Sequence, residues 1–482
     1  MIELLPILSA SSHEPLYLQL YKFIRKEIES GGIPPYTKLP SKRKLAASFQ
    51  ISQNTVNAAY QQLVAEGYLE ARTRSGHYVG KVLEDCSYAG ISRPKQTIKE
   101  WTDEREEYDY VFDHANVDPG AFPFDTWKRL YKDVISETEN LLPLGDPQGD
   151  YKLRHEIAEY LYGSRGVQCS PGQIVIGSGT QALLLLLVQV IGWNRKYAME
   201  NPGYSKVRKV LEHNGVEVKP VPLDKDGLDI LALRDQETEI VYVTPSHQFP
   251  TGIVMPISRR YELLQWAAEK KARYIIEDDY DSEFRYSSRP IPSLQGLDAN
   301  GKVIYLGTFS KALMPSLRLG YMVLPTELLD VYRDRFSFYS QTVSRIDQKV
   351  MERFICEGFW SSHIQKMRNI YGRKKEVLVS SLRKSFGSDL QIFGQDGGLH
   401  ILVGFERKFT EQELIRRAKN EKVLVHSVSM HYAPNTQPVS CNKVLLGFAN
   451  LTEDEIQEGV LCLERAWSTI PSSEVTERRL EE

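Results

Sequence analysis

The sequence predicts an α/β chain in two parts. The first is a small helical module that ends in a β-hairpin, and the second is a large domain with a mainly parallel sheet and helices on both faces. Three observations lead to this prediction. The chain has 482 residues, which is more than one hydrophobic core usually holds. Helical periodicity dominates the first 80 residues, whereas after residue 110 short β-branched runs alternate with helical stretches, as in βαβ units.

Composition divides the chain into four segments. Residues 1–80 are predicted to form the helical module, and residues 110–470 are predicted to form the α/β domain. Residues 81–109 contain glycine, proline and a charged run with little periodic hydrophobicity, so they are predicted to be a linker. Residues 471–482 are predicted to be a polar tail.

The cysteines and the hydropathy exclude several classes of protein. The five cysteines are scattered, and no pair has the spacing of a metal site. We therefore expect no disulfide framework and no metal, and we predict a reduced, cytoplasmic setting. No apolar run approaches the roughly 18 residues that a membrane span needs. The start of the chain also lacks the pattern of a signal peptide, so no membrane is expected among the partners.

The basic residues are unevenly distributed along the chain. The formal net charge is -3, yet residues 1–80 carry nine Lys and Arg against six Asp and Glu. Four basic residues follow one another without an intervening acid: Lys38, Lys42, Arg43 and Lys44. A locally basic segment in a nearly neutral chain fits a small nucleic-acid-binding module joined to another domain.

Three helices are predicted in the helical module. In the first, an apolar residue recurs every four positions from Leu16 to Ile28. Ser41 and Ser52 stand where N-caps are expected for the second and third helices. The tight turn between these two helices predicts a helix-turn-helix. Polar side chains at the start of the third helix are typical of a recognition helix, which presents them to base edges.

Two short strands are predicted after the helices, with basic residues and Gly76 at the tip of their hairpin. Such a hairpin fits a wing that contacts the phosphate backbone or the minor groove. On pattern alone, a dimerisation or packing module fits these helices as well as a DNA-binding module does. On the DNA-binding interpretation, the residues expected at the DNA are Ser41, Lys42, Arg43, Ser52, Gln53, Asn54, Thr55, Asn57, Tyr60, Arg72, Arg74 and Gly76.

Three motifs in this module match a known family: Leu39–Ala46, Ser52–Val56, and Glu66–Leu69 followed by Gly76. They resemble the winged helix of the GntR superfamily, and the resemblance covers residues 15–79. It implies a double-stranded DNA operator as partner. Family members usually carry Arg after the Ser that starts the recognition helix, whereas this chain has Gln53, which brings no charge to a guanine or a phosphate. The operator sequence or the affinity is therefore expected to differ from the family norm.

In the large domain, the strongest chemical signal is Gly307–Lys311, which follows a predicted strand. An amine on a strand-end loop can form a Schiff base with an aldehyde cofactor. Ser310 and Arg318 are placed to hold a phosphate on such a cofactor, with Arg supplying a bidentate fork. Taken alone, the motif also fits an exposed lysine in an ordinary loop.

Further segments support a cofactor site. Gly177–Gln181 follows a strand and opens an apolar helix, which aims backbone N–H groups and the positive helix end at a phosphate. The carboxylates of Glu277–Asp279 stand at a strand end, where one can keep a pyridine nitrogen protonated. An acidic pair at that place also suits Mg²⁺. Tyr280 is placed to donate to a phenolic oxygen, and Tyr204 to stack on a ring face.

Together these segments resemble the fold-type I, class I aminotransferases over roughly residues 110–470. With the winged helix, the chain is similar to the MocR branch of GntR regulators. The resemblance implies a smaller α+β C-terminal subdomain and pyridoxal 5′-phosphate (PLP) on Lys311. It assigns Asp278 to the pyridine nitrogen, with Asp279 left open as the alternative. The full set of cofactor-binding residues implied is Lys311, Asp278, Tyr280, Tyr204, Ser178, Gly179, Thr180, Gln181, Thr308, Ser310 and Arg318.

Two positions depart from the aminotransferase pattern. Phe249 stands where aminotransferases have an Asn that hydrogen-bonds the phenolic oxygen of PLP, and His247 is a possible substitute. The Arg that holds a substrate carboxylate is missing from the stretch Ser427–Tyr432. The residues predicted to bind an effector instead are Lys206, Arg208 and His431.

The predicted function is that of a PLP-dependent, DNA-binding transcription regulator. Its large domain would sense a small amine, an amino-acid-type effector or PLP itself through the Lys311 Schiff base, with at most vestigial transaminase activity. The resemblance also implies a homodimer. The alternative is a PLP-dependent aminotransferase with an accessory N-terminal domain.

Overall fold

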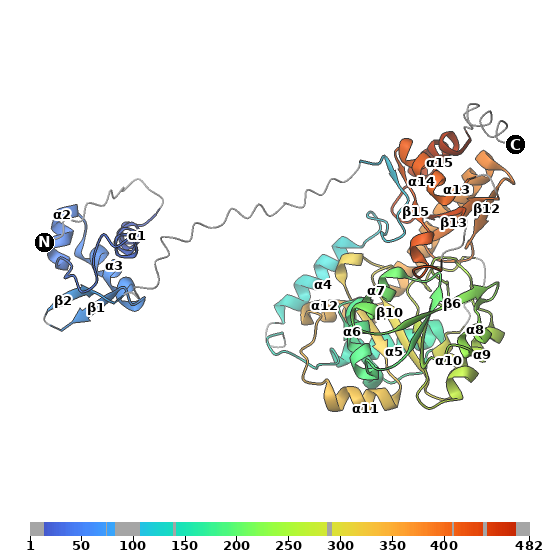
Figure 1. Ribbon diagram of the computed structural model, residues 1–482, viewed down its shortest axis with the longest axis horizontal. Helices are drawn as coiled ribbons and strands as arrows, with labels where there is room; N and C mark the ends of the chain where they lie inside the picture. The colour runs from blue at the N-terminus through green and yellow to red at the C-terminus, as the bar shows by residue number, and fades with distance from the viewer. Residues whose placement is uncertain are drawn as a thin grey trace. The chain divides into compact units, whose positions relative to one another are not determined.

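The structure is a computed structural model, and the chain in it divides into two compact units between Arg105 and Glu106 (Figure 1). Arg74, most of the predicted linker and the predicted polar tail lie outside the described residues. The described ranges are 14–73, 75–81, 107–137, 141–286, 292–406, 409–436 and 441–468.

The N-terminal unit has three helices followed by a hairpin. The two predicted caps are present, since Ser41 Oγ accepts a hydrogen bond from the Lys44 N–H at 3.2 Å and Ser52 Oγ accepts one from the Thr55 N–H at 3.0 Å. Gln50 ends the second helix in the left-handed conformation, with a φ of 54°. The elements are α1 Leu16–Glu29, α2 Lys42–Phe49, α3 Gln53–Ala65, β1 Leu69–Arg72 and β2 Gly76–Val79.

The C-terminal unit is built on a mixed sheet of eight strands in the order β4-β11-β10-β9-β8-β5-β6-β7. Neighbouring strands from β10 to β6 are parallel, whereas β11 runs antiparallel to both of its neighbours and β7 antiparallel to β6. The predicted mainly parallel sheet is therefore confirmed. The strands are β4 Ile174–Gly177, β5 Tyr197–Asn201, β6 Val218–Asp224, β7 Gly227–Leu228, β8 Ile240–Val243, β9 Tyr274–Asp278, β10 Val303–Thr308 and β11 Gly320–Val323.

Helices cover both faces of this sheet (Figure 1). Consecutive residues of β9 point to opposite faces, so Ile275 packs with the side chains of α8 and α9, while Ile276 packs with those of α6, α7 and α11. The helices of this part are α4 Phe124–Ser136, α5 Tyr151–Arg165, α6 Thr180–Ile191, α7 Ser205–His213, α8 Ile230–Arg234, α9 Ile257–Ala268, α10 Leu294–Leu297, α11 Thr326–Arg335 and α12 Arg345–Cys356. Short 3-10 helices are η3 Pro171–Gln173, η4 Pro315–Leu317 and η5 Ser429–His431.

A smaller α+β subdomain follows the long helix α13 Phe359–Phe386. Its sheet is antiparallel, with the strand order β12-β13-β16-β15. The short strand β3 Tyr110–Val111, at the start of the unit, pairs in parallel with β14 of this subdomain. The remaining elements are β12 Leu390–Phe393, β13 His400–Phe405, α14 Glu411–Asn420, β14 Val423–Leu424, β15 His426–Ser427, β16 Lys443–Gly447 and α15 Glu453–Ser468.

The segment after β3 crosses directly over the end of β16. The N–H of Gly447 donates to the Phe112 carbonyl at 3.0 Å. A Cβ at position 447 would lie 2.3 Å from the carbonyl atoms of Asp113 and 2.3 Å from the backbone nitrogen of His114. Only a glycine allows the two backbones to approach so closely, which fixes where Asp113 and His114 stand.

Gly447→Ala is expected to lower the free energy of unfolding by about 1–3 kcal/mol, because the added methyl forces two backbones apart. Denaturant unfolding followed by far-UV circular dichroism measures this change. The matched control is Gly163→Ala in α5, where a Cβ meets nothing within 4 Å. That change is expected to stabilise by about 0.5–1 kcal/mol, through helix propensity. Equal effects of the two substitutions would contradict the packing argument.

Candidate functional site

A cavity of about 540 Å³ lies at the carboxyl ends of the parallel strands β8, β9 and β10. Ligands of open α/β sheets bind at this edge, because the strand-end loops and the helix N-termini meet there. The cavity wall includes Asp278 at the end of β9, Lys311 in the loop after β10, and the first residues of α6. Sequence segments more than a hundred residues apart thus meet at one cavity.

Lys311 lies inside this cavity, and its Nζ donates a hydrogen bond to the backbone carbonyl of His114. Burial lowers the pKa of Lys311 to about 8, because desolvation disfavours the ammonium form. The carboxylates of Asp281 and Asp113 act in the opposite direction and offset part of this effect. A lysine with this pKa has a substantial fraction of neutral, nucleophilic amine near physiological pH.

The adjacent carboxylates Asp278 and Asp279 have different surroundings. Asp278 lines the cavity; its Oδ2 accepts a hydrogen bond from the Tyr242 hydroxyl, and its Oδ1 is buried without a hydrogen-bond partner among the described residues. Asp279 faces away, toward Arg165 Nε at 2.7 Å and the Tyr305 hydroxyl at 2.6 Å. The pKa of Asp278 is raised to about 7 by burial. At Asp279 burial also raises the pKa, but the attraction of Arg165 and the hydrogen bonds from Tyr305, Ser246 and Arg165 together lower it below its usual value.

Donors for an anion converge at the other end of the cavity. Gly179 is the N-cap of α6, so the free N–H groups of the first turn point outward at Thr180 and Gln181. A Cβ at Gly179 would lie 2.8 Å from Arg318 Nη2, so glycine is needed for the guanidinium to stand there. Thr308 Oγ1 lies 3.0 Å from Ser310 Oγ, and both side chains line the cavity.

Ser178 has a different position from the one predicted. It does not line the cavity: its N–H donates to Thr342 Oγ1 at 3.1 Å, and its carbonyl accepts from Arg318 Nη2 at 3.4 Å. Ser178 therefore orients Arg318 through its backbone.

Aromatic side chains form one wall. Tyr204 and Phe249 both line the cavity, with their ring centroids 5.1 Å apart. The Tyr280 hydroxyl donates to the His247 carbonyl at 3.0 Å, and His247 Nδ1 lies 2.9 Å from Asp281 Oδ2. His247 is not part of the cavity wall, so it supports Tyr280 and does not occupy the place of Phe249.

The three predicted effector residues lie at different depths. Lys206 lines the cavity, whereas Arg208 and His431 do not. Arg208 is only 4% exposed, and its Nε and Nη2 have no hydrogen-bond partner in the described part of the chain. His431 is buried, with Nδ1 3.2 Å from Ser205 Oγ, and burial lowers its pKa to about 4.

Sequence reasoning missed several residues of the wall. His114, Tyr242 and His400 line the cavity, yet none belongs to a recognised motif. Tyr242 lies in the buried strand β8, where a tyrosine hydroxyl needs a hydrogen-bond partner, and that need is a signal that the sequence contains. His114 and His400 lie in segments whose sequence contains no motif that would indicate a binding site.

In the N-terminal unit, most predicted DNA-contacting residues are exposed or half-buried. Lys42 Nζ donates to Asn57 Oδ1, which joins α2 to α3. One prediction was wrong. Tyr60 is 0% exposed, and its hydroxyl donates to the Pro40 carbonyl at 3.0 Å, so it is a core residue of the module and cannot contact DNA. Arg74 lies outside the described residues.

Comparisons with known proteins agree with both halves of the chain. Residues 113–461 match the family model of aminotransferase class I and II, and residues 16–79 match that of bacterial regulatory proteins of the gntR family. The chain is 42% identical over 475 residues to the uncharacterized HTH-type transcriptional regulator YdeL of Bacillus subtilis, covering 97% of this chain and 100% of YdeL. It is 34% identical to the probable rhizopine catabolism regulatory protein MocR of Rhizobium meliloti, covering 97% of each chain.

Solved structures show the same fold for the C-terminal unit. The crystal structure of LysN, an α-aminoadipate aminotransferase from Thermus thermophilus complexed with N-(5′-phosphopyridoxyl)-L-leucine, superposes with a TM-score of 0.66. The match covers 74% of this chain and 92% of LysN, at 26% identity.

Fold and site together define a helix-turn-helix transcriptional regulator with an aminotransferase-like domain. The chain belongs to the GntR family of bacterial transcription regulators, in the MocR-type branch that carries an aminotransferase class I and II domain. None of the described helices is both long and apolar enough to cross a membrane.

Asp278→Asn is expected to raise the free energy of unfolding of the ligand-free protein at high pH. The pKa of Asp278 is raised from 3.8 in the unfolded chain to about 7 in the folded protein. The contribution of its protonated carboxyl to the free energy of unfolding is therefore fully present below pH 3.8 and is lost as the pH rises through about 7. Asn carries no charge at any pH and can still accept the hydrogen bond from Tyr242. Urea unfolding at about pH 5.5 and about pH 8.5 should show a gain that grows with pH.

The neighbouring residue provides the matched control. Asp279→Asn removes one partner of a buried ion pair and leaves Arg165 uncompensated, so it is expected to destabilise by roughly 3–5 kcal/mol at both pH values. The same sign of effect for both substitutions at high pH would show that the two carboxylates do not differ as described.

Proposed function

We propose that the C-terminal unit binds PLP covalently through Lys311 and that a small amine effector, bound in the same cavity, regulates the binding of the N-terminal unit to DNA. The observation that carries this proposal is the cavity itself. It combines a half-buried lysine of lowered pKa, an unpartnered carboxylate oxygen of Asp278, and a cluster of anion donors.

Each part of PLP has a partner of suitable chemistry in this cavity. Lys311 would hold the aldehyde carbon, and the unpartnered Asp278 Oδ1 would accept from a protonated pyridine nitrogen. Tyr204 would face the ring. The Tyr280 hydroxyl, which donates to the His247 carbonyl in this structure, would turn to donate to the phenolic oxygen. When bound, PLP supplies an electron sink and a carbonyl that exchanges amines. The phosphate would be held by the helix start and by hydroxyl and guanidinium groups: Gly179, Thr180, Gln181, Thr308, Ser310 and Arg318.

The effector is proposed to be an amine that also carries an anionic group. Lys206 brings a positive charge to the cavity wall. Two residues further along α7, the Arg208 guanidinium is buried, and its Nε and Nη2 have no hydrogen-bond partner among the described residues. A buried cation without a partner is costly, so an anion at this place is strongly favoured. The effector amine would take the place of Lys311 on the cofactor, which would free the Lys311 amine to donate to the His114 carbonyl as it does in the ligand-free structure.

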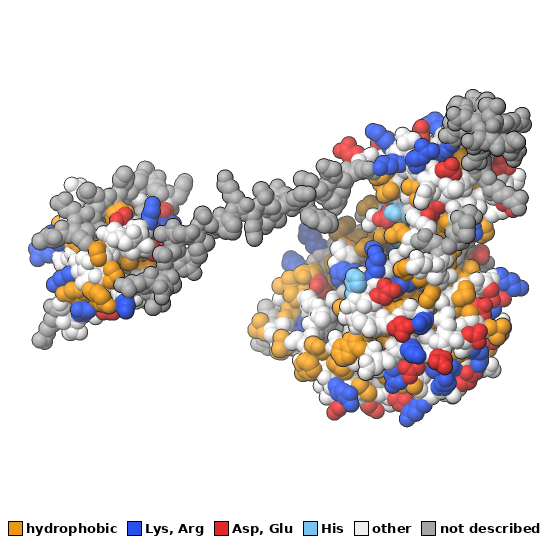
Figure 2. Space-filling model, in the orientation of Figure 1, with side chains coloured by type: hydrophobic (Ala, Val, Ile, Leu, Met, Phe, Trp, Pro, Cys, Tyr) orange, Lys and Arg blue, Asp and Glu red, His pale blue; other side chains and the backbone are white. Residues whose placement is uncertain are grey.

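We propose that the protein binds DNA, and that the effector regulates this binding, as a homodimer. The C-terminal unit exposes large apolar side chains, among them Leu142 at 88%, Leu144 at 79% and Phe338 at 74%. Figure 2 shows apolar side chains gathered on the surface of this unit near α6 and α11. Exposed apolar patches mark association surfaces, and a two-fold dimer would present two winged helices to two operator half-sites.

Lys311→Ala is expected to abolish the imine absorbance of the purified protein and its bleaching by NaBH₄, because the Schiff base is assigned to the Lys311 amine. Lys271→Ala is the control, since that side chain is 86% exposed, and it should leave the absorbance unchanged. In wild type, titration with amines and amino acids should shift the imine spectrum and change DNA affinity together. An unchanged spectrum in Lys311→Ala, or a colourless wild type that PLP does not colour, would refute the cofactor assignment.

Arg43→Ala is expected to weaken binding to a mixed-sequence DNA duplex and to reduce the slope of log affinity against log salt by about 1, as for one lost phosphate contact. Fluorescence anisotropy at several salt concentrations measures both quantities. Lys22→Ala is the control, because its ammonium is already paired with Glu14 on the protein. Equal losses in the two variants would argue against α2 as part of the DNA-binding face.

A further inference from the structure

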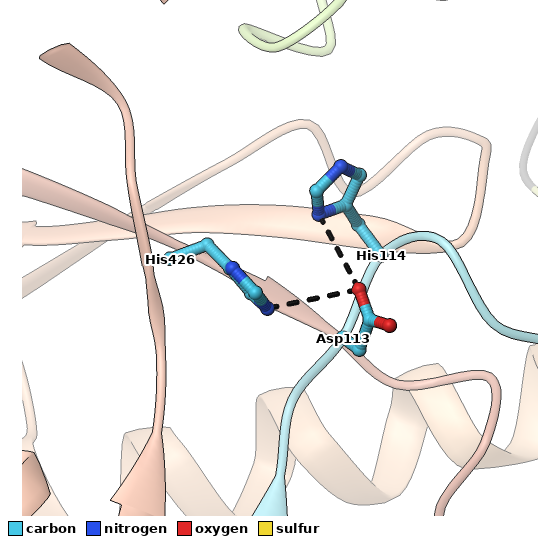
Figure 3. A group of neighbouring side chains, drawn as sticks. All are labelled: Asp113, His114 and His426. Atoms are coloured by element: carbon cyan, nitrogen blue, oxygen red, sulfur yellow. Dashed lines mark ion pairs between the residues drawn. The ribbon is translucent and has the colours of Figure 1, made fainter. Parts of the chain in front are cut away.

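Three ligating side chains meet beside the cavity, from two segments more than three hundred residues apart. Asp113 and His114 follow β3, and His426 begins β15. The parallel register of β3 with β14 pairs Tyr110 with Val423 and Val111 with Leu424, and the next pairs in that register bring Asp113 to the level of His426. Figure 3 shows both imidazole rings directed at the Asp113 carboxylate.

The distances within this cluster are too long for hydrogen bonds. Asp113 Oδ1 lies 3.7 Å from His114 Nδ1 and 3.7 Å from His426 Nε2. All three ligand atoms lie within 4.8 Å of one another. Both imidazole nitrogens are shielded from solvent and have no hydrogen-bond partner in the ranges that the structure describes. Two buried nitrogens and a carboxylate oxygen thus face a common point without bonding to one another.

The two unpartnered imidazole nitrogens, His114 Nδ1 and His426 Nε2, are the atoms that a metal ion would bind. Neutral imidazole is the form that binds metal ions. A buried imidazole nitrogen without a partner costs free energy, and a metal ion at the common point would satisfy both rings at once.

The geometry points to a binding site for a divalent first-row transition metal ion such as Zn²⁺, with Asp113, His114 and His426 as its protein ligands. Zn–N and Zn–O bonds of about 2.0–2.2 Å place tetrahedral ligand atoms roughly 3.3–3.6 Å apart. Each contact of Asp113 with a ring nitrogen, at 3.7 Å, would therefore close by a few tenths of an ångström. The two ring nitrogens lie within 4.8 Å of each other and would close by at most about 1.5 Å. Two histidines and one carboxylate are also a ligand set that leaves open coordination positions.

The surroundings hold the carboxylate in this orientation. Asp113 Oδ1 accepts from the Ala115 N–H at 2.9 Å, and Oδ2 accepts from Asn116 Nδ2 at 2.6 Å. Each carboxylate oxygen keeps a second lone pair for a metal ion, and such outer hydrogen bonds fix the direction of a ligand. Gly447 holds the backbone of Asp113 and His114 against β16, as described above.

The site adjoins the sensing lysine. The same residue that offers its ring to the metal, His114, accepts the hydrogen bond from Lys311 Nζ through its carbonyl. A bound ion would therefore fix the acceptor of Lys311, and a ligand in the cavity could reach an open coordination position, because the His114 side chain belongs to the wall. The sequence alone predicted no metal, since its cysteines lack suitable spacing and these ligands are distant in the chain. The inference stands whether or not Lys311 carries PLP.

The test uses the full chain without a histidine tag, treated with a chelator and dialysed. Isothermal titration with ZnCl₂, together with metal analysis after gel filtration, should show one equivalent of Zn²⁺ bound by wild type. Asp113→Asn and His426→Ala each remove a direct ligand. They should weaken Zn²⁺ binding by at least the roughly 10–100-fold that is typical of losing an outer-shell partner.

The matched control is His155→Ala, because His155 on α5 is half-exposed and lies outside the cluster. It should bind Zn²⁺ as wild type does. His426→Gln, which keeps the size and polarity of the side chain, guards against a loss caused by misfolding, and unchanged circular dichroism should accompany its loss of Zn²⁺. Zinc binding in wild type no tighter than in His426→Gln, or an equal loss in His155→Ala, would overturn the assignment.

Discussion

The buried ion pair between Arg165 and Asp279 is the interaction on which the candidate site depends. Asp278 and Asp279 are neighbours in the chain, and two adjacent carboxylates in the interior would repel each other and lose their hydration. Arg165, at the end of α5, neutralises Asp279 at 2.7 Å, and Tyr305 donates a further hydrogen bond to it. Asp278, on the opposite side of the strand, is left facing the cavity with one oxygen free for a ligand.

Because consecutive residues of an extended strand point in opposite directions, Asp279 faces Arg165 and has a structural role, while Asp278 faces the cavity. The Asp279 carboxylate stabilises the packing of α5 against the sheet. The Asp278 carboxyl keeps one buried oxygen without a hydrogen-bond partner among the described residues, which lowers the stability of the ligand-free protein. The pKa values of the two move in opposite directions for that reason. Lys311 shows the same feature, since its pKa is lowered by the burial that also makes its amine nucleophilic.

The segment that follows β3 connects this site to the C-terminal subdomain. It pairs with β14, passes over Gly447, offers the His114 carbonyl to Lys311 and brings Asp113 beside His426. A shift of the subdomain would therefore move the His114 carbonyl and alter its hydrogen bond with Lys311. Coupling of this kind needs differential contacts in two states, and the Lys311 to His114 hydrogen bond is a contact that a ligand can change.

Local sequence determined the elements and most residues of the cavity, because capping, strand-end loops and helix starts are set by near neighbours. The Ser41 and Ser52 caps and the cavity positions of Lys311, Gly179 and Arg318 followed from motifs a few residues long. Tertiary structure alone decided the remaining questions. It gave Asp278 and Asp279 different surroundings and buried Tyr60 in the core of the N-terminal unit. It also placed Ser178 outside the cavity wall and brought Asp113 close to His426. Each of these outcomes depends on which side chains pack from distant segments, and a linear pattern contains no such information.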